Sequence, residues 1–161
     1  MRVLGVDPGG SGALALLTDG HCTSVVDMPV FLVKRGKSAK AEVDVMSIVD
    51  FMRSWQPDVC YFEQVGGIPG QSASAAFNFG RAAGACEAIV KASGARFVFV
   101  PPARWKKAMQ VTGDKDEARA KATNLFPYAA ASFRRKMDDG RAEAVLLALY
   151  GHRIEAATIF S

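Results

Sequence analysis

Two carboxylates stand where apolar strands are expected to end. Asp7 follows the apolar run Val3–Val6 and precedes a Pro-Gly-Gly turn, and Glu63 follows a second apolar run, Val59–Phe62. Two carboxylates that meet without a cationic side chain repel each other unless a cation lies between them. Magnesium is the expected cation, because it prefers hard oxygen ligands and keeps several of its waters. Each acid taken alone is also explained as a turn residue or a solvated strand end.

A third group of acids opens the last predicted helix. Asp139 and Glu143 are four residues apart, so they share one face of a helix. Asp138 is explained as a helix cap, since aspartate accepts hydrogen bonds from the first free backbone N–H groups. Glu143 lies between Ala142 and Ala144 at the margin of the apolar face, where a free carboxylate is costly. It therefore has the weaker structural explanation.

Together these acids would lie on the first strand, the fourth strand and the last helix. Such a set can hold two metal ions about 4 Å apart beside a scissile phosphate, one activating water and the other stabilising the leaving oxygen. This chemistry needs no catalytic serine or histidine, and the two histidines, His21 and His152, lie far apart in the sequence. The pattern predicts metal-dependent phosphodiester hydrolysis.

Hydrophobic patterning indicates the elements that must position these acids. Strands are expected over residues 2–7, 13–17, 22–27, 59–62 and 96–100. Helices are expected over residues 44–55, 72–93, 103–109, 115–126 and 139–153, and a basic surface loop over 34–40. This order predicts one α/β domain over residues 1–161, with a mixed five-stranded sheet flanked by helices. The topology suggests the RNase H-like fold.

Four segments in the order of a known family span nearly the whole chain. They are Gly5–Gly9 (GVDPG) with Ser11-Gly12, Phe62–Val65 (FEQV), Trp105–Lys107 with Thr112–Lys115, and Asp139–Ala144 (DGRAEA). In these segments the chain resembles RuvC-type Holliday junction resolvases, most closely the bacteriophage forms. The resemblance implies an endonuclease of the RNase H-like fold that resolves four-way and other branched DNA by paired nicks, in recombination and repair.

The resemblance also implies the site residues and partners. Asp7, Glu63, Asp139 and Glu143 are expected to bind magnesium, with manganese as a substitute, and Lys115 matches a motif lysine expected to act in catalysis. A homodimer and nicks with 5′-phosphate and 3′-hydroxyl ends are further expectations.

The chain departs from the cellular RuvC pattern at two places. The cellular pattern has two aspartates three residues apart in the last helix, whereas Asp139 and Glu143 are four apart, and Asp138 remains a candidate ligand. Gly66 stands where cellular RuvC has an aromatic residue that stacks on junction bases. Sequence preference at the cut therefore stays open.

Basic residues cluster between Glu63 and the acids that open the last predicted helix. They favour contacts with DNA phosphates, although a solvated surface is the plainer explanation of any single cluster. The residues expected to bind DNA are Lys106, Lys107, Lys115, Arg119 and Arg135. Trp105 and Trp55 are expected in the core or at its margin.

Composition permits this function without requiring it. The net charge is +4 and the pI is near 9.1, which suits a nucleic-acid partner. The three cysteines show no CxxC spacing, so reduced structural thiols are expected. No targeting segment or membrane-spanning run is recognised, so the expected location is the cytoplasm. A bacterial cell and a phage gene as the origin are implied by the resemblance alone.

The helix expected over residues 72–93 has two apolar stripes instead of one. One stripe contains Phe79, Ala83 and Cys86 and should pack on the sheet. The other contains Phe77, Gly80 and Gly84, small residues for the most part, and is expected to form a homodimer interface. The alternative is that later helices of the same chain cover it.

Three other functions are alternatives for this sequence. A nuclease of the same fold could act on RNA or an RNA–DNA hybrid, and a junction-binding protein could be catalytically silent. The actin-like and sugar-kinase group shares a strand followed by Asp-x-Gly, but it needs two domains, for which 161 residues leave no room.

Overall fold

The computed structural model describes residues 1–35, 38–67 and 69–159, and it contains the predicted mixed sheet of five strands. The strands lie in the order β3-β2-β1-β6-β7, and β1 pairs antiparallel with β2 and parallel with β6. Their bounds are β1 Arg2–Asp7, β2 Ala13–Thr18, β3 His21–Asp27, β6 Val59–Glu63 and β7 Arg96–Val100. Because β1 and β6 run side by side in one direction, their last residues, Asp7 and Glu63, reach the same edge of the sheet.

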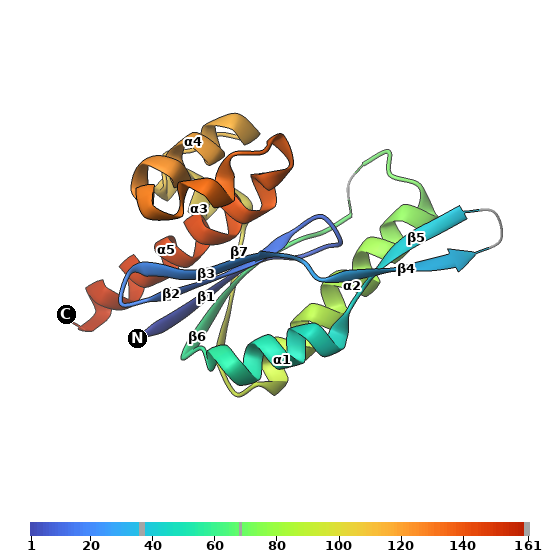
Figure 1. Cartoon of the computed structure of the whole chain (residues 1–161), viewed down its shortest axis with the longest axis horizontal. Coiled ribbons are helices and arrows are strands. Elements are labelled where there is room, and N and C mark those ends of the chain that lie inside the picture. Colours follow the sequence, from blue (N-terminus) through green and yellow to red (C-terminus); the bar gives the residue numbers. More distant parts are fainter. Residues whose placement is uncertain (36–37, 68, 160–161) are drawn as a thin grey trace.

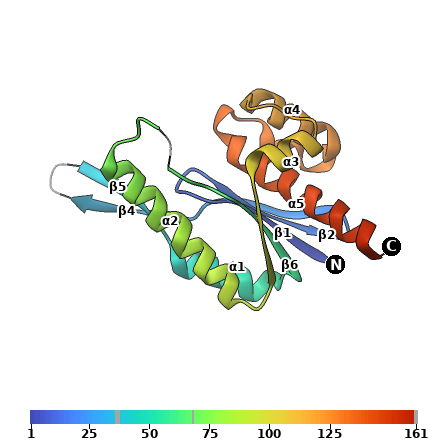
Figure 2. The same ribbon diagram turned by 180° about the vertical axis from the view of Figure 1, so that it is seen from behind.

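Helices cover both faces of this sheet (Figures 1 and 2). Helix α5 (Asp139–Ile159) lies on one face, and α1 (Val45–Trp55) and α2 (Ala73–Ala92) lie on the other. Side chains alternate along each strand, so Val3 joins the core on the α5 side and Leu4 joins the core on the α1 and α2 side. The same alternation places Asp7, two residues beyond Gly5, on the α5 face.

Shorter elements surround the beginning of α5. They are α3 (Pro102–Ala108), α4 (Lys115–Leu125) and the 3-10 helices η1 (Pro127–Phe133) and η2 (Lys136–Asp138). The predicted helices are all present, and α5 continues past its predicted end at residue 153. Within the described ranges, no helix combines the length and the apolar character needed to cross a membrane.

Helix α5 approaches β1 so closely that residue 5 has no room for a side chain. A Cβ atom on Gly5 would lie 2.1 Å from the carbonyl oxygen of Ala144 and 2.6 Å from the backbone nitrogen of Ala148. Both neighbours are helix backbone, which cannot rotate away as a side chain can. Glycine at this position therefore lets α5 seat directly on β1.

The prediction of a basic surface loop over residues 34–40 is wrong for the residues of that range that the structure describes. A separate antiparallel pair, β4 (Val30–Arg35) and β5 (Ser38–Val43), forms a hairpin there, while Gly36 and Lys37 lie outside the described residues. The run of apolar and β-branched residues in β4 favours an extended strand. Pairing with β5 then satisfies the backbone groups that the two strands turn toward each other.

The two stripes of α2 differ in burial as the sequence predicts. Ala83, Cys86 and Val90 are buried against the sheet. In the second stripe Phe77 is 66% exposed, and added Cβ atoms on Gly80 and Gly84 would meet open space among the described residues. The alternative in which later helices of the chain cover this stripe is therefore wrong.

Candidate active site

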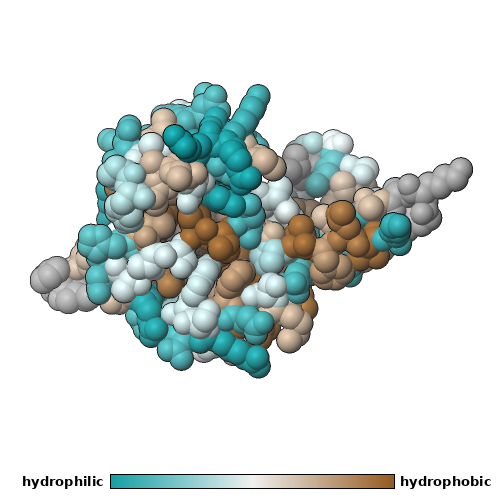
Figure 3. Space-filling view, viewed as in Figure 1, coloured by the Kyte–Doolittle hydropathy of each residue, from teal (hydrophilic) through white to brown (hydrophobic). Residues whose placement is uncertain are grey.

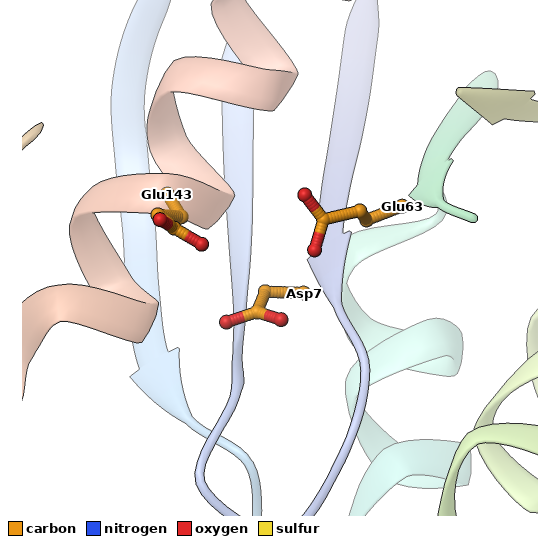
Figure 4. A group of neighbouring side chains, drawn as sticks. All are labelled: Asp7, Glu63 and Glu143. Carbon is orange, nitrogen blue, oxygen red and sulfur yellow. The ribbon is translucent and has the colours of Figure 1, made fainter. Parts of the chain in front are cut away.

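Three of the predicted acids converge at the sheet edge. Asp7 comes from the end of β1, Glu63 from the end of β6 and Glu143 from the second turn of α5, and Figure 4 shows the three side chains around one shared space. Each contributes one carboxylate oxygen to a group whose members all lie within 4.8 Å of one another. The parallel pairing of β1 and β6 supplies two of the acids, and the seating of α5 on Gly5 supplies the third.

These carboxylates repel one another in a setting that has little water. Burial raises the pKa of Asp7 well above its usual value, and the charges of Glu63 and Glu143 raise it further. Burial also raises the pKa of Glu63, which is only 7% exposed. A divalent cation would neutralise this repulsion, and carboxylate oxygens are the donors that magnesium prefers. The residues present therefore fit a metal site.

Helix α3 holds two of the three acids in place. The indole Nε1 of the fully buried Trp105 donates a hydrogen bond of 2.8 Å to Oε1 of Glu63. The next residue, Lys106, donates from Nζ to Oε1 of Glu143, also at 2.8 Å. The prediction that Trp105 lies in the core is confirmed, but its role as a donor to Glu63 was missed. A buried indole needs an acceptor, and this requirement was the available signal.

Asp139, the fourth predicted acid, lies beside the group of three and is not a member of it. It precedes Glu143 by one helical turn, and its carboxylate forms an ion pair with Lys115 at the start of α4. Its charge still contributes to the raised pKa of Asp7. The ion pair raises the pKa of Lys115, whose side chain is 70% exposed. Lys115 is thus at the rim of the site and open to solvent.

Asp138 belongs to a different set of contacts from the one predicted. It is fully buried, and its carboxylate accepts hydrogen bonds from the backbone nitrogen and the guanidinium of Arg135, within 2.9 Å. Arg141 lies 4.0 Å away and also binds Asp27 through both carboxylate oxygens. The expectation that Asp138 caps the last helix is therefore corrected, because its carboxylate turns back to η2. These contacts also separate it from the three converging acids.

The five predicted DNA-binding residues differ in their availability. Lys107 is exposed, and Lys115 is exposed beside Asp139. Lys106 is bound to Glu143. Arg119 is only 17% exposed and binds Asp116 and the carbonyl oxygens of Arg134 and Arg135. Arg135 is 54% exposed but engaged with Asp138. Lysines at the rim are thus better placed for a ligand than the two arginines.

Comparison with known proteins identifies the fold of the chain. No family model matches the sequence, and no curated protein matches it. T. thermophilus RuvC in complex with a Holliday junction substrate aligns with a TM-score of 0.66 at 14% identity, over 98% of this chain and 97% of that one. A second Thermus thermophilus RuvC structure aligns with a TM-score of 0.57 at 18% identity, over 96% and 97% of the two chains. At these identities the likeness shows the fold, which is α/β and RNase H-like. Among RNase H-like folds, it is the one that RuvC has.

Proposed function

We propose that this chain is a magnesium-dependent endonuclease that resolves four-way DNA junctions by paired nicks. The observation that carries the proposal is the convergence of Asp7, Glu63 and Glu143 at the sheet edge of a RuvC fold. One of the solved RuvC structures was determined with a Holliday junction substrate, which makes branched DNA the first substrate to test. Manganese is expected to replace magnesium, because both accept carboxylate oxygen ligands.

In this proposal the acids bind the metal ions, and neighbouring side chains fix the positions of the acids by hydrogen bonds. When bound, divalent cations supply Lewis-acid stabilisation of the phosphate and a water of lowered pKa. Asp7, Glu63 and Glu143 would bind them, with Asp139 as the adjacent fourth acid. Trp105 orients one oxygen of Glu63 and Lys106 one oxygen of Glu143. No serine or histidine nucleophile is required.

The substrate's phosphates would be met by the lysines at the rim. A DNA phosphate would compete with Asp139 for Lys115, whose ammonium group is exposed. We propose Lys106, Lys107 and Lys115 as the nearer contacts. Arg119 and Arg135 remain predicted contacts, although both guanidinium groups already have protein partners.

We further propose a homodimer built on the second stripe of α2. Its support is the exposure of Phe77, Gly80 and Gly84, since an apolar stripe of small residues lets another helix approach closely. A two-fold axis would give a junction two active sites for paired cuts. Gly84→Glu should yield a folded monomer by light scattering that no longer makes paired nicks. A wild-type monomer that still resolves junctions would rule the dimer out.

A cleavage assay with four substrates tests the main proposal. Labelled four-way junction, plain duplex, flap and RNA–DNA hybrid are incubated with and without magnesium, and with manganese in a parallel series. The junction should be cut preferentially and only with metal, by symmetric nicks that leave ligatable 5′-phosphate ends. Preferential cutting of the hybrid would favour the RNA-directed alternative, and binding without cutting would favour the silent junction-binding protein.

A further inference from the structure

The hairpin formed by β4 and β5 stands apart from the five-stranded sheet. Its strands pair with each other and form a separate two-stranded sheet, and Figures 1 and 2 show it extending away from the body beside the beginning of α2. Its root is tied to the active-site edge, because the backbone nitrogen of Met28 donates to the carbonyl oxygen of Gly12 at 2.9 Å. Gly12 in turn packs against the backbone of Asp7. A strand of this length reaches about 20 Å from such a root.

The hairpin exposes apolar side chains along β4. Leu32 is 73% exposed, Phe31 49% and Val30 41%. Figure 3 shows hydrophobic residues over this arm of the molecule. An isolated hairpin is barely stable in water, and an uncovered apolar strand at a sheet edge invites association. This surface is therefore expected to have a partner.

The charge of the hairpin indicates what kind of partner that is. Residues 30–43 contain four of the 20 basic residues of the chain and one of its 16 acidic residues, so the remainder holds 16 basic and 15 acidic residues. The segment thus carries a net charge of +3, and the rest of the chain carries only +1 of the total of +4. The single acid, Glu42, forms an ion pair with Arg81 of α2. Lys34 and Lys40 are exposed and have no ion pair to another described residue.

We infer that the hairpin is a second DNA-binding element, which contacts a duplex arm of the substrate beyond the cleavage site. Lys34 and Lys40 would bind phosphates, and Leu32 and Phe31 would pack against sugars or a groove edge. A second copy of the chain is the less suitable occupant, because pairing two hairpins across a two-fold axis would bring like charges together. The inference rests on the proposed function, since it takes DNA as the substrate.

The test compares DNA arms of two lengths in binding assays without metal, so that cleavage plays no part. Four-way junctions with arms of about 25 and about 6 base pairs are titrated over a range of salt concentrations. Lys34→Gln with Lys40→Gln should weaken binding to the long-armed junction on the order of tenfold and lower the salt slope by about 1.8, the value for two phosphates. On the short-armed junction this double variant should match the wild type. Leu32→Ser should weaken long-arm binding without changing the salt slope.

Arg53→Gln with Lys91→Gln is the matched control, because it removes two positive charges from α1 and α2 outside the hairpin. It should leave the salt slope unchanged. Wild-type affinity and slope in the Lys34 and Lys40 variant would overturn the inference while leaving the proposed function intact. Conversion of a wild-type dimer to a monomer by Leu32→Ser would overturn it in favour of a subunit interface. A wild-type protein that binds no DNA of either arm length would instead overturn the proposed function.

Discussion

Buried acids lie in two places around the beginning of α5, and the negative charge is neutralised differently in each. Glu143 meets Asp7 and Glu63, so three carboxylates share one small space. Asp138, only five residues earlier, meets the guanidinium group of Arg135 and lies near that of Arg141. Glu63 and Asp138 are both buried from water, but only Asp138 has enough positive charge beside it.

The pKa values express this difference. Burial and the neighbouring carboxylates of Glu63, Glu143 and Asp139 raise the pKa of Asp7. Burial alone would also raise the pKa of Asp138, but the hydrogen bonds and charge of Arg135 outweigh it and the pKa is lowered. A buried acid is therefore not in itself a sign of a binding site. A buried acid among other acids is such a sign, because only an added cation completes it.

The largest expected effect comes from removing a converging acid. Asp7→Asn or Glu143→Gln should slow junction cleavage by roughly 1,000-fold, equivalent to about 4 kcal/mol of lost transition-state stabilisation. Thermal stability should be unchanged or higher, because a repelling charge is gone. Cleavage rates in magnesium and unfolding temperatures measure the two effects separately. A variant that cuts at the wild-type rate would refute the metal assignment of that residue.

Asp138→Asn should show the opposite pattern. It replaces a fully buried carboxylate by a neutral amide and weakens the hydrogen bonds from the half-exposed Arg135, which should cost about 1.5 kcal/mol of unfolding free energy. Where the variant is still folded, at low temperature, it should cleave at close to the wild-type rate. Urea unfolding together with cleavage assays tests both parts. An unchanged unfolding midpoint would restore the simpler view of Asp138 as a replaceable cap.

Trp105→Phe tests how much the hydrogen bond to Glu63 contributes to metal binding. The ring is kept but the donor to Glu63 is lost, so magnesium affinity should fall roughly tenfold, as for other partners of metal ligands. Calorimetric titration of magnesium measures this directly. Trp55→Phe is the control, since Trp55 stacks on Phe51 in α1, away from the acids. Equal losses of affinity in the two variants would show a general effect of the tryptophan replacement.

The smallest expected effect is a dependence of stability on pH. Because the pKa values of Asp7 and Glu63 are raised in the folded protein, the folded state binds more protons than the unfolded chain above about pH 4. Without metal, their contribution to stability should therefore fall as pH rises from about 4 through the raised pKa values.

Magnesium should compensate for this fall. The rise in unfolding temperature on adding magnesium should be larger at about pH 8 than at about pH 5, by a few degrees. Asp7→Asn should show both a shallower pH dependence and a smaller response to magnesium. Calorimetry of the two proteins at both pH values is the measurement. An equal response of the wild type at the two pH values would show that the raised pKa values of Asp7 and Glu63 do not cause the pH dependence.

The strands that carry Asp7 and Glu63 could be predicted because each is a short apolar run buried on both faces of the sheet. In the last helix, Glu143 joins them as predicted, but the position of Asp139 outside the group of three could not be predicted. Asp138, Asp139 and Glu143 lie within a turn and a half of helix, and the contact between Gly5 and Ala144 sets how α5 is rotated and seated. That contact joins residues far apart in the sequence, so local patterning does not contain it.

Two other features were missed for related reasons. The bond between Trp105 and Glu63 joins residues 42 positions apart, and burial of the indole was visible in the sequence while its acceptor was not. The sequence predicts a loop over residues 34–40 because basic residues such as those found there are typical of a solvated surface. Strand pairing depends on the register between β4 and β5. Ser38–Val43 alternates polar and apolar residues, but Val30–Val33 is a continuous apolar run without that alternation.

The contact at Gly5 also determines how the site can open. Because β1 meets the backbone of α5 without an intervening side chain, the two elements cannot separate without exposing the core on the α5 side of the sheet. Amide protons in the middle of β1, such as those of Leu4 and Val6, should then exchange with solvent only through global unfolding. The acids would not rearrange one at a time around an incoming ligand. Their spacing is set before binding, so discrimination between ions of different radius would come from the rigidity of the scaffold.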